Sequence, residues 1–322
     1  MAGGKNQTLV TEFILLGFSD LSKLKNYLFT LFFVMYILTV VGNIGIIILV
    51  RTDPRLHTPM YFFLGNLSFI DFFYSATITP NTLVSFLVEE KSISLAGCAT
   101  QLYCIAMLAT SECFLLAVMA YDRYVAICNP LLYSVLMTQR VRIQLMTSVY
   151  IGGLLHSLIQ TSNVFSVSFC GPNVINHFYC DAPPILKLSC SDTFVHETVL
   201  SVFASFVTTL PLLVIVLSYC YILSAILRIR SAQGRRKAFS TCSSHVITVT
   251  LFFGTVIIMY VIPSSSFSLS KDRALSVVYA VIIPMVNPIT YSLRNNDVKQ
   301  ALRKVIVRNL IFKVVHGLPC IP

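Results

Sequence analysis

The stretch MAYDRYVAIC, from Met119 to Cys128, decides the fold of this chain. It closes a long apolar run with the pair Asp122–Arg123, and Cys98 lies 25 residues before that arginine. At 1.5 Å per helical residue this separation is roughly 38 Å, enough to cross the hydrocarbon of a bilayer and reach the headgroups. One helix is therefore predicted to carry a cysteine at one membrane face and an arginine at the other.

The composition predicts a membrane protein. Of 322 residues, 56% are hydrophobic and only 11% are charged, whereas a soluble domain contains about 25% charged residues. Lipid cannot satisfy backbone polar groups, so the spans must be helices or a closed barrel, and apolar runs of about 20 residues have the length of helices. We predict an all-α membrane protein, a bundle of seven transmembrane helices at about residues 26–50, 59–83, 97–127, 141–163, 198–227, 238–262 and 273–293. The bundle is one domain, residues 26–293, between an N-terminal segment, 1–25, and a tail, 294–322.

The basic residues predict the orientation, because Lys and Arg gather on the cytoplasmic side of membrane proteins. Loops one, three and five and the tail contain 16 of the 23 basic residues and three acidic residues, whereas the other side has seven basic and eight acidic residues. The 16 are Arg51, Arg55, Arg123, Arg140, Arg142, Arg228, Arg230, Arg235, Arg236, Lys237, Arg294, Lys299, Arg303, Lys304, Arg308 and Lys313. We therefore expect a multi-pass plasma membrane protein with an extracellular N-terminus, a cytoplasmic C-terminus and contacts to anionic lipids, and we do not expect nucleic acid as a partner.

The two terminal segments carry one signal each. Asn6-Gln7-Thr8 is a glycosylation sequon on the outer side. In the tail, apolar residues recur near helical spacing among Lys and Arg, which predicts an amphipathic helix on the inner leaflet, with a solvated basic tail as the alternative. These apolar residues are Leu302, Val305, Ile306 and Leu310.

Four of the ten cysteines, Cys98, Cys170, Cys180 and Cys190, fall on the oxidising side of the membrane. Four cysteines allow three pairings. Bonding Cys98 to Cys180 would fix the long outer loop to the third span, and bonding Cys170 to Cys190 would close that loop on itself. A disulfide-bonded Cys180 offers no thiolate to a metal beside His177, so we expect neither a metal site nor a cofactor.

Four polar side chains lie deep within the spans at roughly one depth. Asp71 and Glu112 are acids, which are costly in a membrane and functional by default, and Asn43 and Asn287 accompany them. We predict one buried network that changes between two states; the alternative is that each side chain caps a neighbouring backbone. Pro288 frees a backbone carbonyl and kinks its helix, which makes this helix end a candidate moving part.

Six motifs in chain order point to one family. They are Gly42-Asn43, LHTPMYFFLGNLSFID from Leu56 to Asp71, MAYDRYVAIC, Ser218-Tyr219, KAFSTCSSH from Lys237 to His245, and PMVNPITYSLRN from Pro284 to Asn295. With them the chain resembles rhodopsin-like G-protein-coupled receptors, and specifically vertebrate olfactory receptors of the tetrapod type. One departure is Phe253, which stands where many members carry tyrosine.

The resemblance implies the disulfides Cys98–Cys180 and Cys170–Cys190. It also implies that Asp122 holds Arg123 in the inactive state, and that the receptor couples to a stimulatory olfactory-type G protein and raises cAMP. The residues expected to switch or couple are Asp122, Arg123, Tyr124, Tyr219, His245, Asn287, Pro288 and Tyr291.

The outer halves of the third, fifth, sixth and seventh spans contain no charged side chain, so a charged ligand would lose hydration without meeting a counter-ion. We expect a small, neutral, lipophilic, volatile odorant with one hydroxyl or carbonyl group. Leu102, Ile105, Ala106 and Ala109 share one face of the third span, and Thr110 and Thr208 offer hydroxyls. The family's usual cavity adds Phe203, Val207, Val256, Ile257, Tyr260, Val277 and Ala280.

Other protein classes fit less well. A channel or transporter would need a polar pore or inverted repeats, and the sequence offers neither. An intramembrane enzyme would need a motif such as His-Glu-x-x-His or Gly-x-Ser-x-Gly, and none occurs. We therefore expect an odorant receptor and not an enzyme, with a receptor of the same family acting outside the olfactory epithelium as the alternative.

Overall fold

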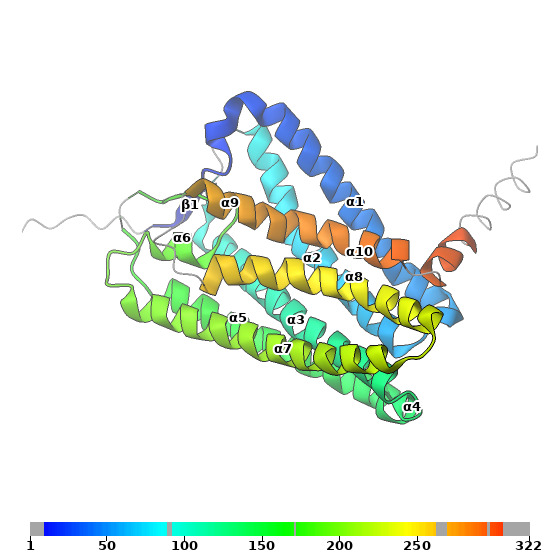
Figure 1. Ribbon diagram of the computed structural model, residues 1–322. Coiled ribbons are helices and arrows are strands. Elements are labelled where there is room, and N and C mark those ends of the chain that lie inside the picture. The colour runs from blue at the N-terminus through cyan, green and yellow to red at the C-terminus, as the bar shows by residue number, and fades with distance from the viewer. Residues whose placement is uncertain (1–9, 89–91, 171, 262–268, 295–296, 305–322) are drawn as a thin grey trace, which may run out of the picture.

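The computed structural model describes residues 10–88, 92–170, 172–261, 269–294 and 297–304, except for the side chains of 22, 237, 240, 241, 260, 261, 269–272 and 292–294 (Figure 1). Asn6 of the sequon therefore lies outside the described residues. The described part forms a bundle of seven long helical stretches. These are α1 (Lys25–Thr52), α2 (Pro59–Leu87), α3 (Leu95–Cys128), α5 (Gln139–Phe165), α7 (Phe194–Arg228), α8 (Ala232–Val256) with η3 (Ile257–Val261), and α9 (Leu269–Val277) with η5 (Val278–Ile282) and α10 (Ile283–Arg294).

Each predicted span overlaps one of these stretches, and the fold is the predicted helical bundle. The seventh stretch differs from a uniform α-helix, because η5 is π-helical and joins α9 to α10, and η3 likewise ends the sixth stretch in a π-helix. A π-helix has one more residue per hydrogen-bonded turn than an α-helix. The side of the helix on which a residue lies can therefore not be assigned by α-helical spacing along η3 and η5.

Five of the described helical stretches are long and apolar enough to cross a membrane, and α2 and α5 are not among them. Both are long enough, with 29 and 27 residues. The polar residues of α2 face the bundle instead of lipid, since Ser68, Asp71, Ser75, Thr79 and Thr82 are all buried. Low hydropathy in α2 therefore reflects a polar interior and not a water-exposed helix.

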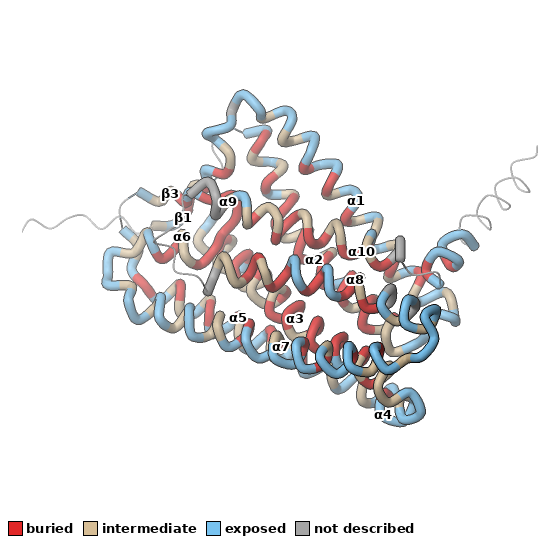
Figure 2. Tube along the Cα trace, viewed as in Figure 1, coloured by how far each residue is buried: buried red, intermediate tan, exposed pale blue. Residues whose placement is uncertain are grey.

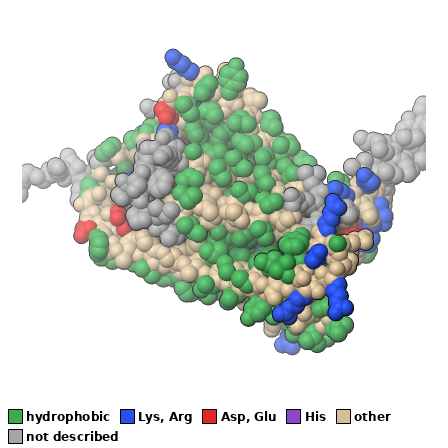
Figure 3. All heavy atoms as spheres, viewed as in Figure 1, with side chains coloured by type: hydrophobic (Ala, Val, Ile, Leu, Met, Phe, Trp, Pro, Cys, Tyr) green, Lys and Arg blue, Asp and Glu red, His purple; other side chains and the backbone are tan. Residues whose placement is uncertain are grey.

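The outer surface of the bundle is apolar. In α1 and α7 only 28% and 22% of the most apolar stretch is buried, and Figure 2 shows α7 with its exposed residues along its outer side. Figure 3 shows hydrophobic side chains over the middle of this face and Lys and Arg gathered at one end, beside α4 (Tyr133–Leu136) and the start of α8. This distribution is that of a protein whose middle is surrounded by lipid.

The opposite end, which we call the disulfide end, contains both disulfides, Cys98–Cys180 and Cys170–Cys190. A small sheet lies there that the sequence analysis does not predict, because its strands are too short to show a period. Its strand order is β2-β1-β3. The strands are β1 (Glu12–Leu15), β2 (Ser92–Ser94) and β3 (Val174–Ile175), with β1 antiparallel to β2 and parallel to β3. The sheet therefore joins the N-terminal segment to two loops.

Two contacts fix α9 to the disulfide end. Arg273 forms a bidentate ion pair with Asp20, with both N–O distances 2.7 Å, and donates to the carbonyl of Gly17 at 2.8 Å. The hydrogen bonds from Arg273 lower the pKa of Asp20. Nearby, the imidazole of His177 lies 3.0 Å from Ser276 Oγ and 3.2 Å from the carbonyl of Tyr179. The outer loop is thus fixed to the start of the seventh stretch.

Acid should loosen this contact. Burial lowers the pKa of His177 from 6.5 to about 4, so between these values the unfolded chain binds more protons and stability falls as pH falls. At 1.36 kcal/mol per unit the loss reaches about 3 kcal/mol near pH 4. We expect the thermal unfolding midpoint of the solubilised protein to fall more steeply between about pH 7 and pH 5 in wild type than in His177→Gln. Equal slopes would contradict this assignment.

At the basic end, residues 297–304 form a short helix beyond α10. Val298 and Ala301 are buried and Leu302 is exposed, so this helix has an inner and an outer face. Tyr61 donates to Asp297 Oδ2 at 3.0 Å, which ties the helix to the start of α2. Val305, Ile306 and Leu310 of the predicted amphipathic helix lie outside the described residues.

Candidate functional site

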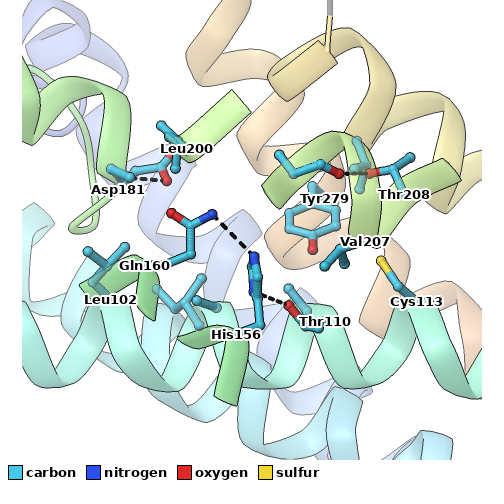
Figure 4. Close-up of a pocket in the computed structure, with 16 residues that line it drawn as sticks. Leu102, Thr110, Cys113, His156, Gln160, Asp181, Leu200, Val207, Thr208 and Tyr279 are labelled. Carbon is cyan, nitrogen blue, oxygen red and sulfur yellow. Dashed lines mark hydrogen bonds between the residues drawn. The ribbon is translucent and has the colours of Figure 1, made fainter. Parts of the chain in front are cut away.

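A cavity of about 100 Å³ lies inside the bundle towards the disulfide end, between α3, α5, α7, α8 and η5 (Figure 4). The short helix α6 (Ala182–Leu186) of the outer loop contributes to its wall. The residues that line it are Leu102, Ile105, Ala106, Ala109, Thr110, Cys113, His156, Gln160, Asp181, Ala182, Leu200, Ala204, Val207, Thr208, Val256 and Tyr279. A cavity of roughly 150 Å³ holds benzene, so this somewhat smaller space limits a ligand to a small organic molecule.

The third helix supplies the longest wall of the cavity because its inward face repeats at helical spacing. Leu102, Ile105, Ala106 and Ala109 follow the i, i+3, i+4, i+7 pattern. Two of these are alanines, and Ala204 faces them from α7. Small side chains at these places leave the volume that larger ones would fill.

Eight of the thirteen residues expected around a ligand line this cavity, and they lie mainly on α3. They are Leu102, Ile105, Ala106, Ala109, Thr110, Val207, Thr208 and Val256. Phe203, Ile257, Val277 and Ala280 do not line this cavity, and the side chain of Tyr260 lies outside the described residues. In η5 the π-helical spacing turns Tyr279 towards the cavity in place of Ala280, which is fully buried in packing. Phe203 instead packs near the His156 ring, with centroids 6.1 Å apart.

The cavity has a polar wall that the sequence analysis does not predict. His156 and Gln160 of α5 stand one helical turn apart, and Figure 4 shows His156 between Thr110 and Gln160. His156 Nδ1 lies 2.8 Å from Thr110 Oγ1, and His156 Nε2 lies 3.2 Å from Gln160 Nε2. The signal was present in the sequence, since polar residues at i and i+4 interrupt the fourth span on one face.

One charged side chain of the outer loop lines the cavity, although the outer halves of the predicted third, fifth, sixth and seventh spans contain none. Asp181, directly after the disulfide cysteine Cys180, lines the cavity from the outer loop. Its Oδ1 accepts a hydrogen bond of 2.9 Å from the backbone N–H of Ala182, at the start of α6. This carboxylate was missed because the sequence places it in a loop, and tertiary contacts, the disulfide Cys98–Cys180 among them, bring the loop over the helices.

Below the cavity lies the polar cluster, which we define as Asp71, Glu112, Thr248 and Asn287. The amide of Asn287 donates to both oxygens of Asp71, at 3.3 and 3.0 Å, and accepts from Thr248 Oγ1 at 3.1 Å. Glu112 interacts electrostatically with Asp71 and Asn287. Thus α2, α3, α8 and α10 meet at one buried set of polar groups.

Asn43 stands apart from this polar cluster. Its amide donates to the carbonyls of Thr39 and Pro284, at 2.9 and 3.0 Å, and in the described part of the chain it forms no hydrogen bond with the other three network residues. The single four-residue network is therefore wrong for Asn43, which caps backbone as the alternative proposed. Proline at 288 lacks the N–H that would engage the Pro284 carbonyl within the helix, so that carbonyl is free to accept from Asn43.

Replacing Asn287 by leucine should destabilise the protein by about 2–3 kcal/mol, because a buried carboxyl loses its donor. Thr248→Val removes one donor to Asn287 and leaves Asp71 bonded, so we expect a loss of about 1 kcal/mol. Thermal unfolding of the solubilised variants measures both. The opposite order of the two effects would show that Asn287 does not support Asp71.

The far end of α3 carries Arg123, which is buried. Its guanidinium interacts with Cys242 of α8. The Asp122 carboxylate accepts a hydrogen bond of 2.9 Å from the hydroxyl of Tyr133 in α4, and it also interacts electrostatically with its neighbour Arg123. A loop helix therefore contacts the acid, and the arginine interacts with the sixth helical stretch.

Near Arg123 a hydrogen bond joins the fifth and sixth stretches. Tyr219 OH lies 2.8 Å from His245 Nδ1, and the rings stack at 5.8 Å. Tyr124 packs with Ile222 and Cys242 in the same region. The predicted switch residues on α3, α7 and α8 thus lie together.

The remaining two switch residues, Pro288 and Tyr291, lie on α10. Tyr291 is buried. A Cβ placed on Gly42 of α1 would come within 3.0 Å of the Pro288 ring. The glycine therefore allows α1 and α10 to approach closely at the proline.

Comparison with known proteins agrees with this arrangement. The sequence profile described as olfactory receptor matches residues 32–309. Olfactory receptor 5AP2 of Mus musculus is 53% identical over 94% of this chain and 95% of its own length. Olfactory receptor 5AP2 of Homo sapiens is 50% identical over 96% of this chain and 98% of its own length. Olfactory receptor 5F1 of Homo sapiens is 52% identical over 94% of this chain and 97% of its own length.

Proposed function

Because this chain belongs to the olfactory receptor family, we propose that it binds a small, neutral, lipophilic odorant in the cavity beneath the outer loop. Members of the family are G-protein-coupled receptors of the plasma membrane and not enzymes, so the chain is a seven-helix receptor that senses odorants. The lining is mainly aliphatic, which suits an apolar carbon skeleton. Burying about 200 Å² at about 25 cal/mol/Å² contributes roughly 5 kcal/mol before the costs of association, so micromolar or weaker affinity is expected.

The end that carries Arg123 faces the cytoplasm in this proposal. The gathering of Lys and Arg at that end supports it. The disulfides at the other end support it too, since disulfides persist in an oxidising compartment. The N-terminus is then extracellular and the C-terminus cytoplasmic.

One observation carries the proposed mechanism: α3 bears the cavity wall, the polar cluster and Arg123 in a single helix. Cys113 lines the cavity, and its neighbour Glu112 belongs to the polar cluster. In this mechanism α3 packs against α5 and α7 in two alternative ways. A ligand that binds one of these arrangements more tightly than the other increases the fraction of receptors in that arrangement. The shifted helix releases Arg123 towards a stimulatory olfactory-type G protein, and adenylyl cyclase raises cAMP.

The test is a screen of the receptor, expressed with the olfactory-type stimulatory α subunit, against a broad panel of neutral volatiles. We expect a concentration-dependent rise in cAMP that requires both the receptor and the G protein. A receptor that reaches the cell surface and responds to no volatile would overturn the proposal. An agonist-evoked current that survives block of the G protein would instead indicate a channel.

A further inference from the structure

Gln160 has a side chain that its surroundings do not fully satisfy. It lies on α5, is 4% exposed and lines the cavity. Its amide nitrogen contacts His156, but its Oε1 has no hydrogen-bond partner in the described part of the chain. A buried polar atom without a partner costs about 1–3 kcal/mol. A group of this kind, facing a cavity, is a binding site for a polar atom of a ligand.

The neighbouring hydrogen bonds limit what that polar atom can be. Thr110, His156 and Gln160 form a chain whose protons can run in either direction, because a neutral imidazole has one donor and one acceptor nitrogen. In one direction His156 accepts from the amide N–H and Gln160 presents an acceptor to the cavity. In the other the amide is flipped, its oxygen accepts from His156 Nε2–H, and Gln160 presents a donor.

We propose that Gln160 binds the hydroxyl group of the odorant, and that the ligands of this receptor are compact apolar alcohols. A hydroxyl both donates and accepts, so it matches Gln160 in either direction of the chain. A ketone or aldehyde only accepts hydrogen bonds, so it can bind Gln160 in the one direction of the chain that presents a donor. A hydrocarbon can bond to Gln160 in neither direction. This inference rests on the proposed function, since it assumes that the cavity holds the odorant.

The rest of the cavity fits an alcohol of modest size. Aliphatic groups, such as those of Leu102, Ile105, Val207 and Val256, surround the space for the carbon skeleton. A hydroxyl that displaces a water molecule from Gln160 also replaces its hydrogen bonds, which a hydrocarbon cannot do. The cavity is small enough that skeletons of about six or seven carbons are the natural probes.

Asp181 provides the one charge that would favour a different class, the amines. Its carboxylate lines the same cavity. Its Oδ1 is already engaged by the backbone N–H of Ala182 at the start of α6, so the carboxylate has a structural role in the loop. Amines are therefore included in the test as compounds whose preference would contradict the inference.

The test uses three sets of compounds that share a skeleton within each set. They are cyclohexanol, cyclohexanone, cyclohexane and cyclohexylamine; 1-hexanol, hexanal, hexane and hexylamine; and benzyl alcohol, benzaldehyde, toluene and benzylamine. In at least one set we expect wild type to respond to the alcohol at about tenfold lower concentration than to the other members, because a site built to bond a hydroxyl rejects analogues without it. The readout is cAMP, normalised to surface staining.

Gln160→Met keeps the shape of the side chain and removes both polar atoms. We expect it to lose about tenfold in sensitivity to the alcohol and none to the hydrocarbon. Gln144→Met is the matched control, since Gln144 is exposed on the same helix, and it should respond as wild type does. If Gln160→Met fails to reach the surface, Gln160→Asn, which keeps the amide but shortens its reach, should lose the preference instead.

The outcomes separate this inference from the function on which it rests. An alcohol preference that survives in the Gln160 variant on the surface overturns the inference, as does a wild-type preference for the carbonyl compound or the amine. Activation by the broad volatile panel with no response to any of the three sets also overturns it while leaving the proposed function intact. Silence of the surface-expressed wild type towards every volatile overturns both.

Discussion

Replacing Gly153 by alanine is expected to keep most of the receptor from the cell surface. A Cβ at Gly153 of α5 would overlap Ser111 Oγ and lie 2.8 Å from the backbone carbonyl oxygen of Met107. The carbonyl belongs to α3 and cannot turn away, so the two helices must separate. A Cβ at the neighbouring Gly152 would lie 3.0 Å from the Phe114 ring, so the packing around α5 is also tight at this position.

Overpacking of this kind costs about 1–3 kcal/mol and more when backbone must move, and a loss of 1–2 kcal/mol already changes cellular abundance several-fold. The measurement is antibody staining of an N-terminal tag on intact cells. Since the wall of the cavity is shared by α3 and α5, the few receptors at the surface should also respond weakly.

Gly45→Ala and Gly254→Ala are the matched controls for this prediction. A Cβ at either glycine meets no atom within 4 Å in the described part of the chain. Alanine is about 1 kcal/mol more favourable than glycine within a helix, so both controls should reach the surface at wild-type levels or above. Equal behaviour of Gly153→Ala and the two controls would show that the close approach of α3 and α5 is not required.

Residue patterns predict the helical bundle well because lipid leaves few alternatives. Length and hydropathy are enough for α1, α3 and α7, whose apolar residues face outwards. They are weaker for α2, where buried polar side chains such as Asp71 lower the hydropathy. The apolar run of residues 59–83 nevertheless predicts this helix.

The cavity is predicted only in part, for two physical reasons. Helical periodicity is reliable where the helix is regular, so the α3 wall is predicted correctly, but it fails in η5, where Tyr279 takes the expected place of Ala280. Tertiary contacts have no local signal at all. Asp181 follows a disulfide cysteine that helps to hold its loop over the cavity, and Asp122 accepts a hydrogen bond from Tyr133, eleven residues away.

Arg123→Ala should abolish the cAMP response and leave surface expression near that of wild type. Arg123 is the buried cation at the basic end of α3, and it interacts with Cys242 of α8. Alanine removes this charge, while the apolar packing of Leu115, Leu116 and Met119 along the same helix is retained. The fold therefore survives, but the group that would be released towards the G protein is absent.

The control for Arg123→Ala is Arg140→Ala, which removes an exposed arginine at the same end. It should change the response by no more than about twofold, because an exposed charge contributes little on its own. Both variants are measured as cAMP produced at saturating agonist per receptor on the surface. A full response in Arg123→Ala would rule out its role in coupling. A basal cAMP level above that of wild type would mean that Arg123 acts mainly as a lock between α3 and α8, because the interaction with Cys242 then matters more than any contact with the G protein.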